Sequence, residues 1–169
     1  MTADKQLEKQ FKEWDENWRN VKRSKKWTDG VKAMEEQMAK HGCSSSILEV
    51  YSPPRVTGLM DKIKGIPGLA LDLTTEDTDG RPWDFNCEDK REKAKRMVRN
   101  KEALLVIGSP MCAAFSRLQH LNFGRLSKEE VDKVLEYGKK HLEFCMELYR
   151  IQLDNGLYFL HEHPASARS

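Results

Sequence analysis

From position 46 onward, short apolar runs alternate with longer segments that are apolar on one side only. The apolar runs have the length of strands, and runs of this kind are typical of strands buried on both faces of a parallel sheet. They lie at 47–51, 69–72, 83–85, 104–107 and 157–161. Helical spacing is found at 56–63, 88–100 and 127–155, and the last of these segments opens on a capping-box sequence, Ser127-Lys-Glu-Glu130. The alternation predicts an α/β fold with a three-layer, Rossmann-like parallel sheet of about five strands.

The first 42 residues follow a helical pattern instead. Spacings of four and three residues predict a helix from about 3 to 25, with an apolar seam formed by Leu7, Phe11, Trp14, Trp18 and Val21. A second helix is expected after a break at 27–30, with Thr28 as its N-cap and Gly42 just beyond its end. Because the seam has no sustained heptads, packing on the sheet is favoured over a separate partner-binding arm. We therefore expect a helical extension at 1–42, packed on the sheet, and an α/β domain at 43–169.

Composition adds few constraints. The chain has 29 basic and 27 acidic residues, so its charge neither requires nor excludes a nucleic-acid partner. The four cysteines lie far apart and form no CxxC pair, which argues against a zinc site and against a disulfide framework. The N-terminus is charged and no apolar run approaches the ~20 residues that cross a bilayer. We expect a soluble intracellular protein, in the cytoplasm or the nucleus, with no membrane partner; its oligomeric state is left open.

The most informative stretch is the loop after the 104–107 run, Gly108-Ser-Pro-Met-Cys112. Ligands of open α/β sheets bind beyond the carboxyl ends of strands, so a cysteine placed here is a candidate nucleophile. Together with Phe115-Ser116, the loop resembles the catalytic loop of the DNA (cytosine-5) methyltransferases, in which a strand runs into a Gly-Pro-Pro-Cys turn. Met111 stands where that family has its second proline. From Ile47 to Pro164 the chain resembles methyltransferase-like segments of retroelement polyproteins.

The resemblance implies an S-adenosylmethionine-dependent methyltransferase that acts on cytosine in nucleic acid. Cys112 would supply the thiolate that adds to the ring, and Glu162 stands where the family has the glutamate of its Glu-Asn-Val motif. The cofactor S-adenosylmethionine would lie across the ends of the first strands. Glu49 and Asp72 match the acids that hold it there, and Asp84 would meet the adenine edge. On this interpretation Glu49, Asp72, Cys112 and Glu162 line one cleft.

The sequence also departs from the family. Tyr51-Ser-Pro-Pro-Arg55 replaces the glycine-rich turn that follows the first strand, and the prolines offer no amide donors. The family's further strands, Arg-rich motif and target-recognition region would follow the glutamate motif, so we expect an α/β domain that is incomplete at its C-terminus. A second hypothesis is therefore a partial or inactive member, a catalytically silent structural or nucleic-acid-associated module derived from a retroelement polyprotein.

Several residues have more than one interpretation. Arg55 and Arg117 lie near expected strand ends and are candidates for phosphate contacts, although surface arginines are common. Cys112 with His161 or His163 has the residue types of a Cys-His hydrolase but no nucleophile-elbow pattern. The two histidines have no third ligand in view, so polar packing is favoured and no metal site is predicted. The acids at strand ends are equally compatible with capping.

Overall fold

The computed structural model describes residues 12–13, 16–17, 19–21, 24–111 and 113–162. Within these ranges, with η marking 3₁₀ helices, the elements are α2 (Lys25–His41), β1 (Ser45–Val50), η1 (Thr57–Ile63), β2 (Pro67–Leu71), α3 (Glu88–Arg99), β3 (Ala103–Gly108), η2 (Ala113–Phe115), α4 (Arg117–Phe123), α5 (Lys128–Asp154) and β4 (Tyr158–His161). All strand pairs are parallel, and the order across the sheet is β2-β1-β3-β4. The predicted α/β fold with a parallel sheet is confirmed, with four strands rather than five.

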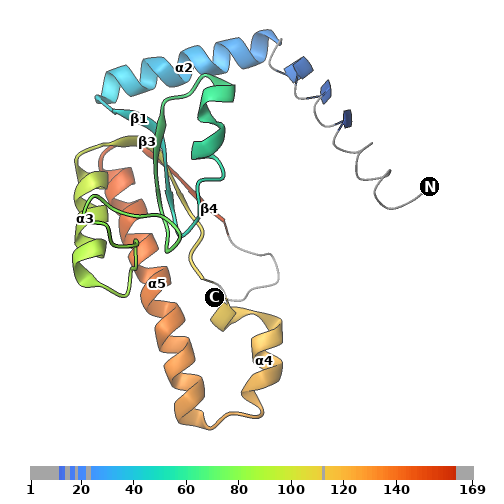
Figure 1. The fold of residues 1–169 in the computed structure, drawn as a ribbon, viewed down its shortest axis with the longest axis vertical. Helices are drawn as coiled ribbons and strands as arrows, with labels where there is room; N and C mark the ends of the chain where they lie inside the picture. The colour runs from blue at the N-terminus through green and yellow to red at the C-terminus, as the bar shows by residue number, and fades with distance from the viewer. Residues whose placement is uncertain (1–11, 14–15, 18, 22–23, 112, 163–169) are drawn as a thin grey trace.

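Helices cover both faces of the sheet (Figure 1). Leu48 and Val106 pack in the cluster under α3 and α5, on one face. Ile47 and Ile107 pack with Met60 of η1 on the other face. Successive residues of a strand point to opposite faces, so this division follows from the alternation along β1 and β3. The strand order reverses between β1 and β3, which is where ligands of open α/β sheets bind.

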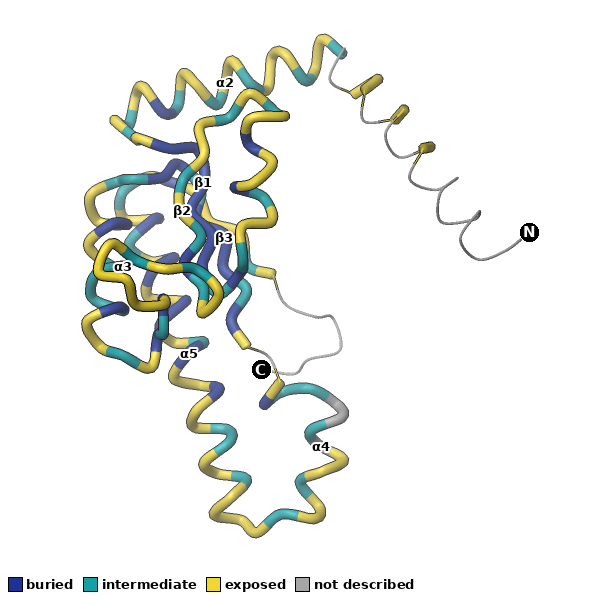
Figure 2. The backbone as a smooth tube through the Cα atoms, viewed as in Figure 1, coloured by how far each residue is buried: buried dark blue, intermediate teal, exposed yellow. Residues whose placement is uncertain are grey.

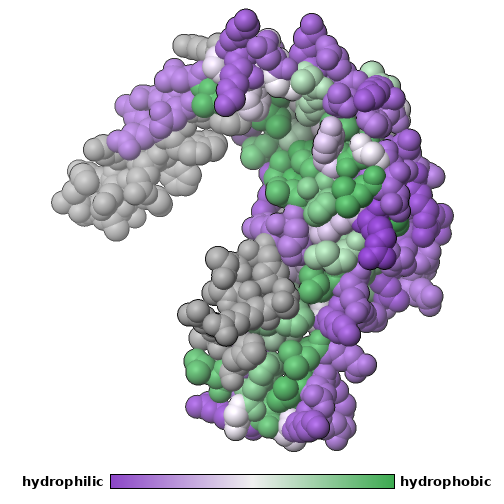
Figure 3. Space-filling view, turned by 180° about the vertical axis from the view of Figure 1, so that it is seen from behind, coloured by the Kyte–Doolittle hydropathy of each residue, from purple (hydrophilic) through white to green (hydrophobic). Residues whose placement is uncertain are grey.

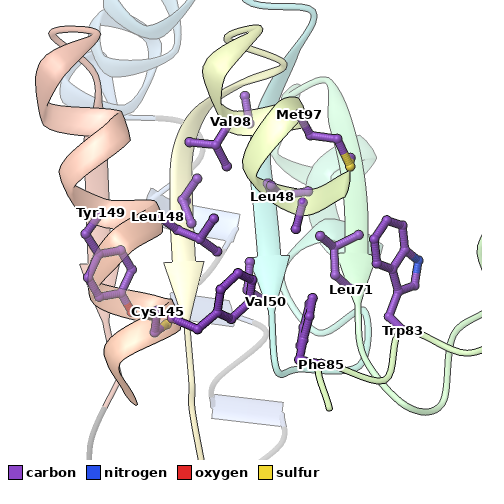
Figure 4. Close-up of a cluster of buried hydrophobic side chains, with 14 residues drawn as sticks. Leu48, Val50, Leu71, Trp83, Phe85, Met97, Val98, Cys145, Leu148 and Tyr149 are labelled. Carbon is purple, nitrogen blue, oxygen red and sulfur yellow. Dashed lines mark hydrogen bonds between the residues drawn. The ribbon is translucent and has the colours of Figure 1, made fainter. Parts of the chain in front are cut away.

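The main core lies between the sheet and the helices α3 and α5 (Figure 4). Burial of each large apolar side chain stabilises the fold by about 1.5–3 kcal/mol. The labelled members are Leu48, Val50, Leu71, Trp83, Phe85, Met97, Val98, Cys145, Leu148 and Tyr149, all of them buried.

The predicted strand at 83–85 is wrong. Trp83 and Phe85 are both buried, but the backbone between them turns back on itself, since the Asp84 amide donates to the Pro82 carbonyl at 2.9 Å. Within this described segment, an isolated bridge between Glu76 and Pro82 is the only strand-like pairing. The two aromatic side chains therefore fill the core from a loop, which is why their pattern resembled a short strand.

An ion-pair cluster attaches this loop to α3. The Lys90 ammonium donates to Asp77 at 2.6 Å and to Asp79 at 2.8 Å, and Lys93 also donates to Asp77. The side chains of Lys90 and Asp77 are only 2% and 3% exposed. Lys90 also lies 5.2 Å from the centre of the Trp83 ring, within cation–π range. Opposite charges thus hold the loop in place without regular secondary structure.

Helix α2 begins earlier than expected. Its N-cap is Ser24, whose hydroxyl accepts a hydrogen bond from the Trp27 amide at 3.2 Å, so Thr28 lies inside the helix and the N-cap prediction is wrong. An exposed glycine inside a helix costs only about 1 kcal/mol, so Gly30 does not break it. Gly42 ends the helix with a left-handed φ of 69°, as predicted.

The contacts of α2 with the sheet are made by its C-terminal half. Met38 is buried against Leu104 and Leu157, and Met34 packs at the margin of the same cluster. The earlier predicted helix, at 3–25, falls mostly outside the described residues, and those that are described at 12–13, 16–17 and 19–21 are helical.

The helices α4 and α5 extend beyond the carboxyl end of the sheet (Figures 1 and 2). The capping box predicted at Ser127 and Glu130 is present and starts α5, whose first turns are largely exposed. Gly138 allows η2 to approach, because a Cβ there would lie 2.6 Å from that of Ala114. The sequence did not predict η2 or α4. Within the described ranges, no helix combines the length and apolar character needed to span a membrane.

Strand β4 forms one edge of the sheet and exposes apolar side chains. Tyr158 and Leu160 are 51% and 53% exposed, and Phe159 is 39% exposed. Viewed from behind, the molecule is curved, and hydrophobic side chains gather on its inner side between α2 and the α4–α5 pair (Figure 3). An edge strand of this kind is an available pairing surface.

Candidate functional site

The carboxyl ends of the four strands form one rim, as the sequence predicted. The pairing continues into the loops that follow the strands. The Tyr51 amide donates to the Leu71 carbonyl at 3.0 Å, the Ser109 amide to the Val50 carbonyl at 3.0 Å, and the Glu162 amide to the Gly108 carbonyl at 2.9 Å. The segments that carry the candidate residues are therefore held side by side.

The loop after β3 contacts the end of β4. The Ser109 hydroxyl donates to the Glu162 carboxylate at 2.8 Å, which places this predicted catalytic acid beside the Gly-Ser-Pro-Met segment. Glu162 is exposed, as is Met111. Cys112, the predicted nucleophile, lies outside the described residues. The structure therefore describes the two flanks of this part of the rim, Ser109 and Glu162.

Gly108 has a packing role at the base of the same loop. A Cβ at this position would lie 2.1 Å from the Tyr149 hydroxyl and 2.5 Å from the Cys145 sulfur, so only glycine fits. The Cys145 thiol donates to the Tyr149 hydroxyl at 3.1 Å, and that hydroxyl lies 2.9 Å from His161 Nδ1. Burial raises the pKa of Cys145 to about 12, so this thiol stays protonated at neutral pH. The cluster also occupies one nitrogen of His161, a residue that the hydrolase alternative would need.

Glu49 does not reach the rim. Its side chain is 1% exposed and turns toward the loop that leads into η1. Oε2 accepts hydrogen bonds from the Thr57 amide and hydroxyl, both at 2.7 Å, and from the Val56 amide at 3.1 Å. Oε1 accepts from the same Val56 amide at 3.1 Å and from the Ser52 hydroxyl at 3.3 Å. The carboxylate therefore anchors its own loop.

Asp72 and Asp84 line the same small pocket, which we call the rim pocket. It has a volume of about 150 Å³ and is lined by Tyr51, Asp72, Trp83, Asp84, Tyr137 and His141, among others. Asp72 follows β2 and accepts hydrogen bonds from the amide and hydroxyl of Thr74. Asp84 accepts from the amide and the side chain of Asn86. In both acids Oδ1 is the acceptor, and among the described residues nothing donates to Oδ2.

Two residues that the sequence did not single out form the inner wall of the rim pocket. The Tyr51 hydroxyl and His141 Nδ1 lie 2.8 Å apart, and the two rings are in edge contact. Burial raises the pKa of Tyr51. Burial also lowers the pKa of His141, and the charges of Lys140 and Arg91 lower it further, so the imidazole is neutral at pH 7. His141 Nε2 is buried and has no hydrogen-bond partner among the described residues.

The signal for His141 was present in the sequence. It lies four residues before Cys145 and four after Tyr137, on the side of α5 that faces the sheet. A histidine on the apolar side of a helix calls for a polar partner, but its partner, Tyr51, is 90 residues away in the sequence. Local patterns do not show such a pairing.

The candidate phosphate contacts lie apart from each other in the chain. Arg55 is exposed on the loop between β1 and η1. Arg117 is the first residue of α4, and its side chain lies outside the described part of the structure. Within the described ranges, no group of three or more His, Cys, Asp or Glu residues is arranged to hold a metal ion.

Comparisons with protein-family models, with curated proteins and with solved structures found no match to this chain. The structure itself defines the class of protein. It is an α/β protein with a parallel sheet and a polar rim at the carboxyl ends of its strands.

Proposed function

We propose that this chain is a methyltransferase-like α/β module that is catalytically silent, and that its role is structural. The observation that carries the proposal is the burial and hydrogen bonding of Glu49. The resemblance to cytosine-5 methyltransferases assigns this acid to S-adenosylmethionine, yet both of its oxygens accept hydrogen bonds from the loop at 52–57 and the side chain is buried. A carboxylate committed in this way has no free acceptor for ribose hydroxyls.

The size of the rim pocket supports the same proposal. Sites for drug-sized ligands usually have volumes of about 300–1,000 Å³. The rim pocket has about 150 Å³, and the Tyr51 ring, 4.8 Å from the Phe85 ring and hydrogen-bonded to His141, occupies the side next to β1. A nucleoside with an amino-acid tail exceeds this space.

The second candidate function is an active S-adenosylmethionine-dependent methyltransferase acting on nucleic-acid cytosine through Cys112 and Glu162. Two observations favour it. Asp72 and Asp84, both assigned to the cofactor by the resemblance, line one pocket, and Ser109 connects the Cys112 loop to Glu162. In a third form of the proposal, the chain associates with nucleic acid, with or without catalysis. Arg55 and Arg117 would then be the residues that contact phosphate.

Titration calorimetry with S-adenosylmethionine and a radiolabelled methyl-transfer assay on cytosine-containing DNA and RNA separate these functions. We expect no saturable heat and no transfer. Transfer that disappears in Cys112→Ala, at an unchanged melting temperature, would overturn the proposal. A saturable complex weakened by Asp72→Asn but not by Asp61→Asn, an exposed aspartate of η1 outside the pocket, would support the active enzyme.

A further inference from the structure

The two edges of the sheet differ in how they are protected. The edge strand β2 begins with Pro67, which has no N–H, and its Ala70 carbonyl accepts a hydrogen bond from the Thr75 hydroxyl at 2.6 Å. In the described part of the chain, β4 pairs only with β3, and its four residues include no Asp, Glu, Lys, Arg or Pro. Native proteins usually protect an edge with charge, proline or a covering loop. An edge with none of these protections is suited to pairing with another strand.

The hydrogen bond at the end of β4 determines which of its backbone groups point away from β3. The Glu162 amide donates to the Gly108 carbonyl of β3 at 2.9 Å. Successive residues of a strand direct their N–H and C=O groups to opposite sides, so Tyr158 and Leu160 also face β3. Phe159 directs both of its backbone groups to the open edge. One donor and one acceptor in this position match the backbone of an extended chain.

The side chains of β4 make this edge apolar on both faces of the sheet. Tyr158 and Leu160 are exposed and lie on the face that η1 covers. Phe159 is exposed on the other face, where its ring stacks on that of Tyr149 of α5 at 4.5 Å. The strand that pairs with β4 must therefore be extended and must present apolar side chains to both faces.

The strand β4 meets both requirements for itself when it runs in the opposite direction. In an antiparallel pair about a two-fold axis at Phe159, the two Phe159 residues exchange both backbone hydrogen bonds, and Tyr158 of each copy lies opposite Leu160 of the other. Each exposed side chain of the strand then faces an apolar one, and such cross-strand pairs are stabilising. The two Glu162 carboxylates would lie about 20 Å apart, beyond the screening length of about 10 Å, so they do not oppose the contact.

We propose that β4 pairs with β4 of a second copy of this chain, antiparallel about a two-fold axis at Phe159, so that the two four-stranded sheets join into one. A two-fold contact of this kind closes at two copies. One short strand buries less than the standard interface of about 1,600 Å², so we expect a reversible dimer with a micromolar Kd. This inference does not depend on whether the chain binds S-adenosylmethionine.

The first test is sedimentation velocity of the full chain between about 1 and 200 µM, a range that brackets a weak interface. We expect the sedimentation coefficient to rise from that of a monomer to that of a dimer. Leu160→Lys should weaken the dimer about tenfold or more, because it places a charge in the apolar pair with Tyr158. The matched control is Leu73→Lys, since Leu73 is also exposed but follows β2 at the opposite edge. A monomer at all concentrations, species larger than a dimer, or equal effects of the two substitutions would overturn the proposal.

The second test is cross-linking, which reports the register of the pair. With the axis at Phe159, the two Cα atoms at this position would lie about 5.5 Å apart, a distance that suits a disulfide. Phe159→Cys should therefore give a covalent dimer under mild oxidation, seen on a non-reducing gel. The two Cα atoms at position 158 would lie more than about 7 Å apart, so Tyr158→Cys should give little more than the wild type, which has four cysteines of its own. Equal yields from the three proteins would overturn the proposed pairing.

Discussion

Replacing Glu49 by glutamine distinguishes an anchor of the fold from a cofactor ligand. The carboxylate receives hydrogen bonds from three residues of its own loop, and the shortest are those from the amide and hydroxyl of Thr57, both at 2.7 Å. Glu49→Gln keeps the shape and one acceptor oxygen but removes the charge. Glu49→Ala removes both oxygens and leaves the Thr57 and Val56 donors without an acceptor.

Hydrogen bonds that share one carboxylate do not add in full, so the expected losses are smaller than the sum over the individual bonds. Hydrogen bonds to a charged group contribute about 1.5–3 kcal/mol and neutral ones about 0.5–1.5 kcal/mol. With its oxygen at the Oε2 position, glutamine retains the three bonds made there in neutral form. We therefore expect Glu49→Gln to lower the free energy of unfolding by about 2 kcal/mol, and Glu49→Ala, which strands buried donors, by about 4 kcal/mol.

Urea unfolding followed by far-UV circular dichroism measures both variants, and the glutamine variant should also lose about 4–8 °C in melting temperature. Glu35→Gln is the control, because Glu35 is exposed on α2 and its neutralisation should stay within about 0.5 kcal/mol. If Glu49→Gln unfolds at the wild-type midpoint, the carboxylate does not anchor the loop. Glu49 would then again be a candidate ligand of S-adenosylmethionine.

Other perturbations probe the core and the ion-pair cluster. Gly108→Ala should destabilise the protein by about 2 kcal/mol through the clash with the Tyr149 hydroxyl, and adding Tyr149→Phe should recover part of that loss in urea unfolding. Burial raises the pKa of Asp77, but the hydrogen bonds from Lys90 and Lys93 outweigh it and hold the pKa at about 2. Because the pKa of Asp77 is lower in the folded than in the unfolded protein, Asp77 stabilises the fold above about pH 4. The urea midpoint should therefore fall as the pH drops toward about 2, and it should fall less steeply in the Lys90→Met variant. The Cys145 thiol should resist a disulfide reagent at pH 8 in folded protein and react in urea; equal rates would contradict its burial.

The elements that the sequence predicted well are those specified by neighbouring residues. The run at 104–107 became β3 because continuous apolar residues suit a strand covered on both faces. Ser127 and Glu130 form their capping box within four consecutive residues, and Gly42 ends α2 through its own backbone conformation. Each of these signals is complete within one turn or strand, so no tertiary information is needed to interpret it.

The rim residues were harder because their roles depend on distant partners. Glu49 and Asp72 looked alike as acids near strand ends, yet alternation along β1 turns Glu49 toward η1, whereas Asp72 follows β2 and faces the rim pocket. Asp84 reaches that pocket from a loop that the sequence predicted as a strand. The wall formed by Tyr51 and His141 joins residues that lie 90 positions apart in the chain, a pairing that no local pattern specifies.

The backbone conformation of Tyr51 bears on both the resemblance to the methyltransferases and the geometry of the rim pocket. It has a φ of 62°, a left-handed conformation that is uncommon for a bulky residue and natural for glycine. On the resemblance to the cytosine-5 methyltransferases, Tyr51 would stand at the start of the segment that replaces their glycine-rich turn, and its side chain lines the rim pocket there. Conformations of this kind cost about 1–3 kcal/mol and persist where surrounding contacts hold them. Here the holding contacts are those to Phe85 and His141, which also form the rim pocket. On the proposed function, the same tyrosine would keep a large cofactor out of the rim, and it forms part of the wall of the small pocket there.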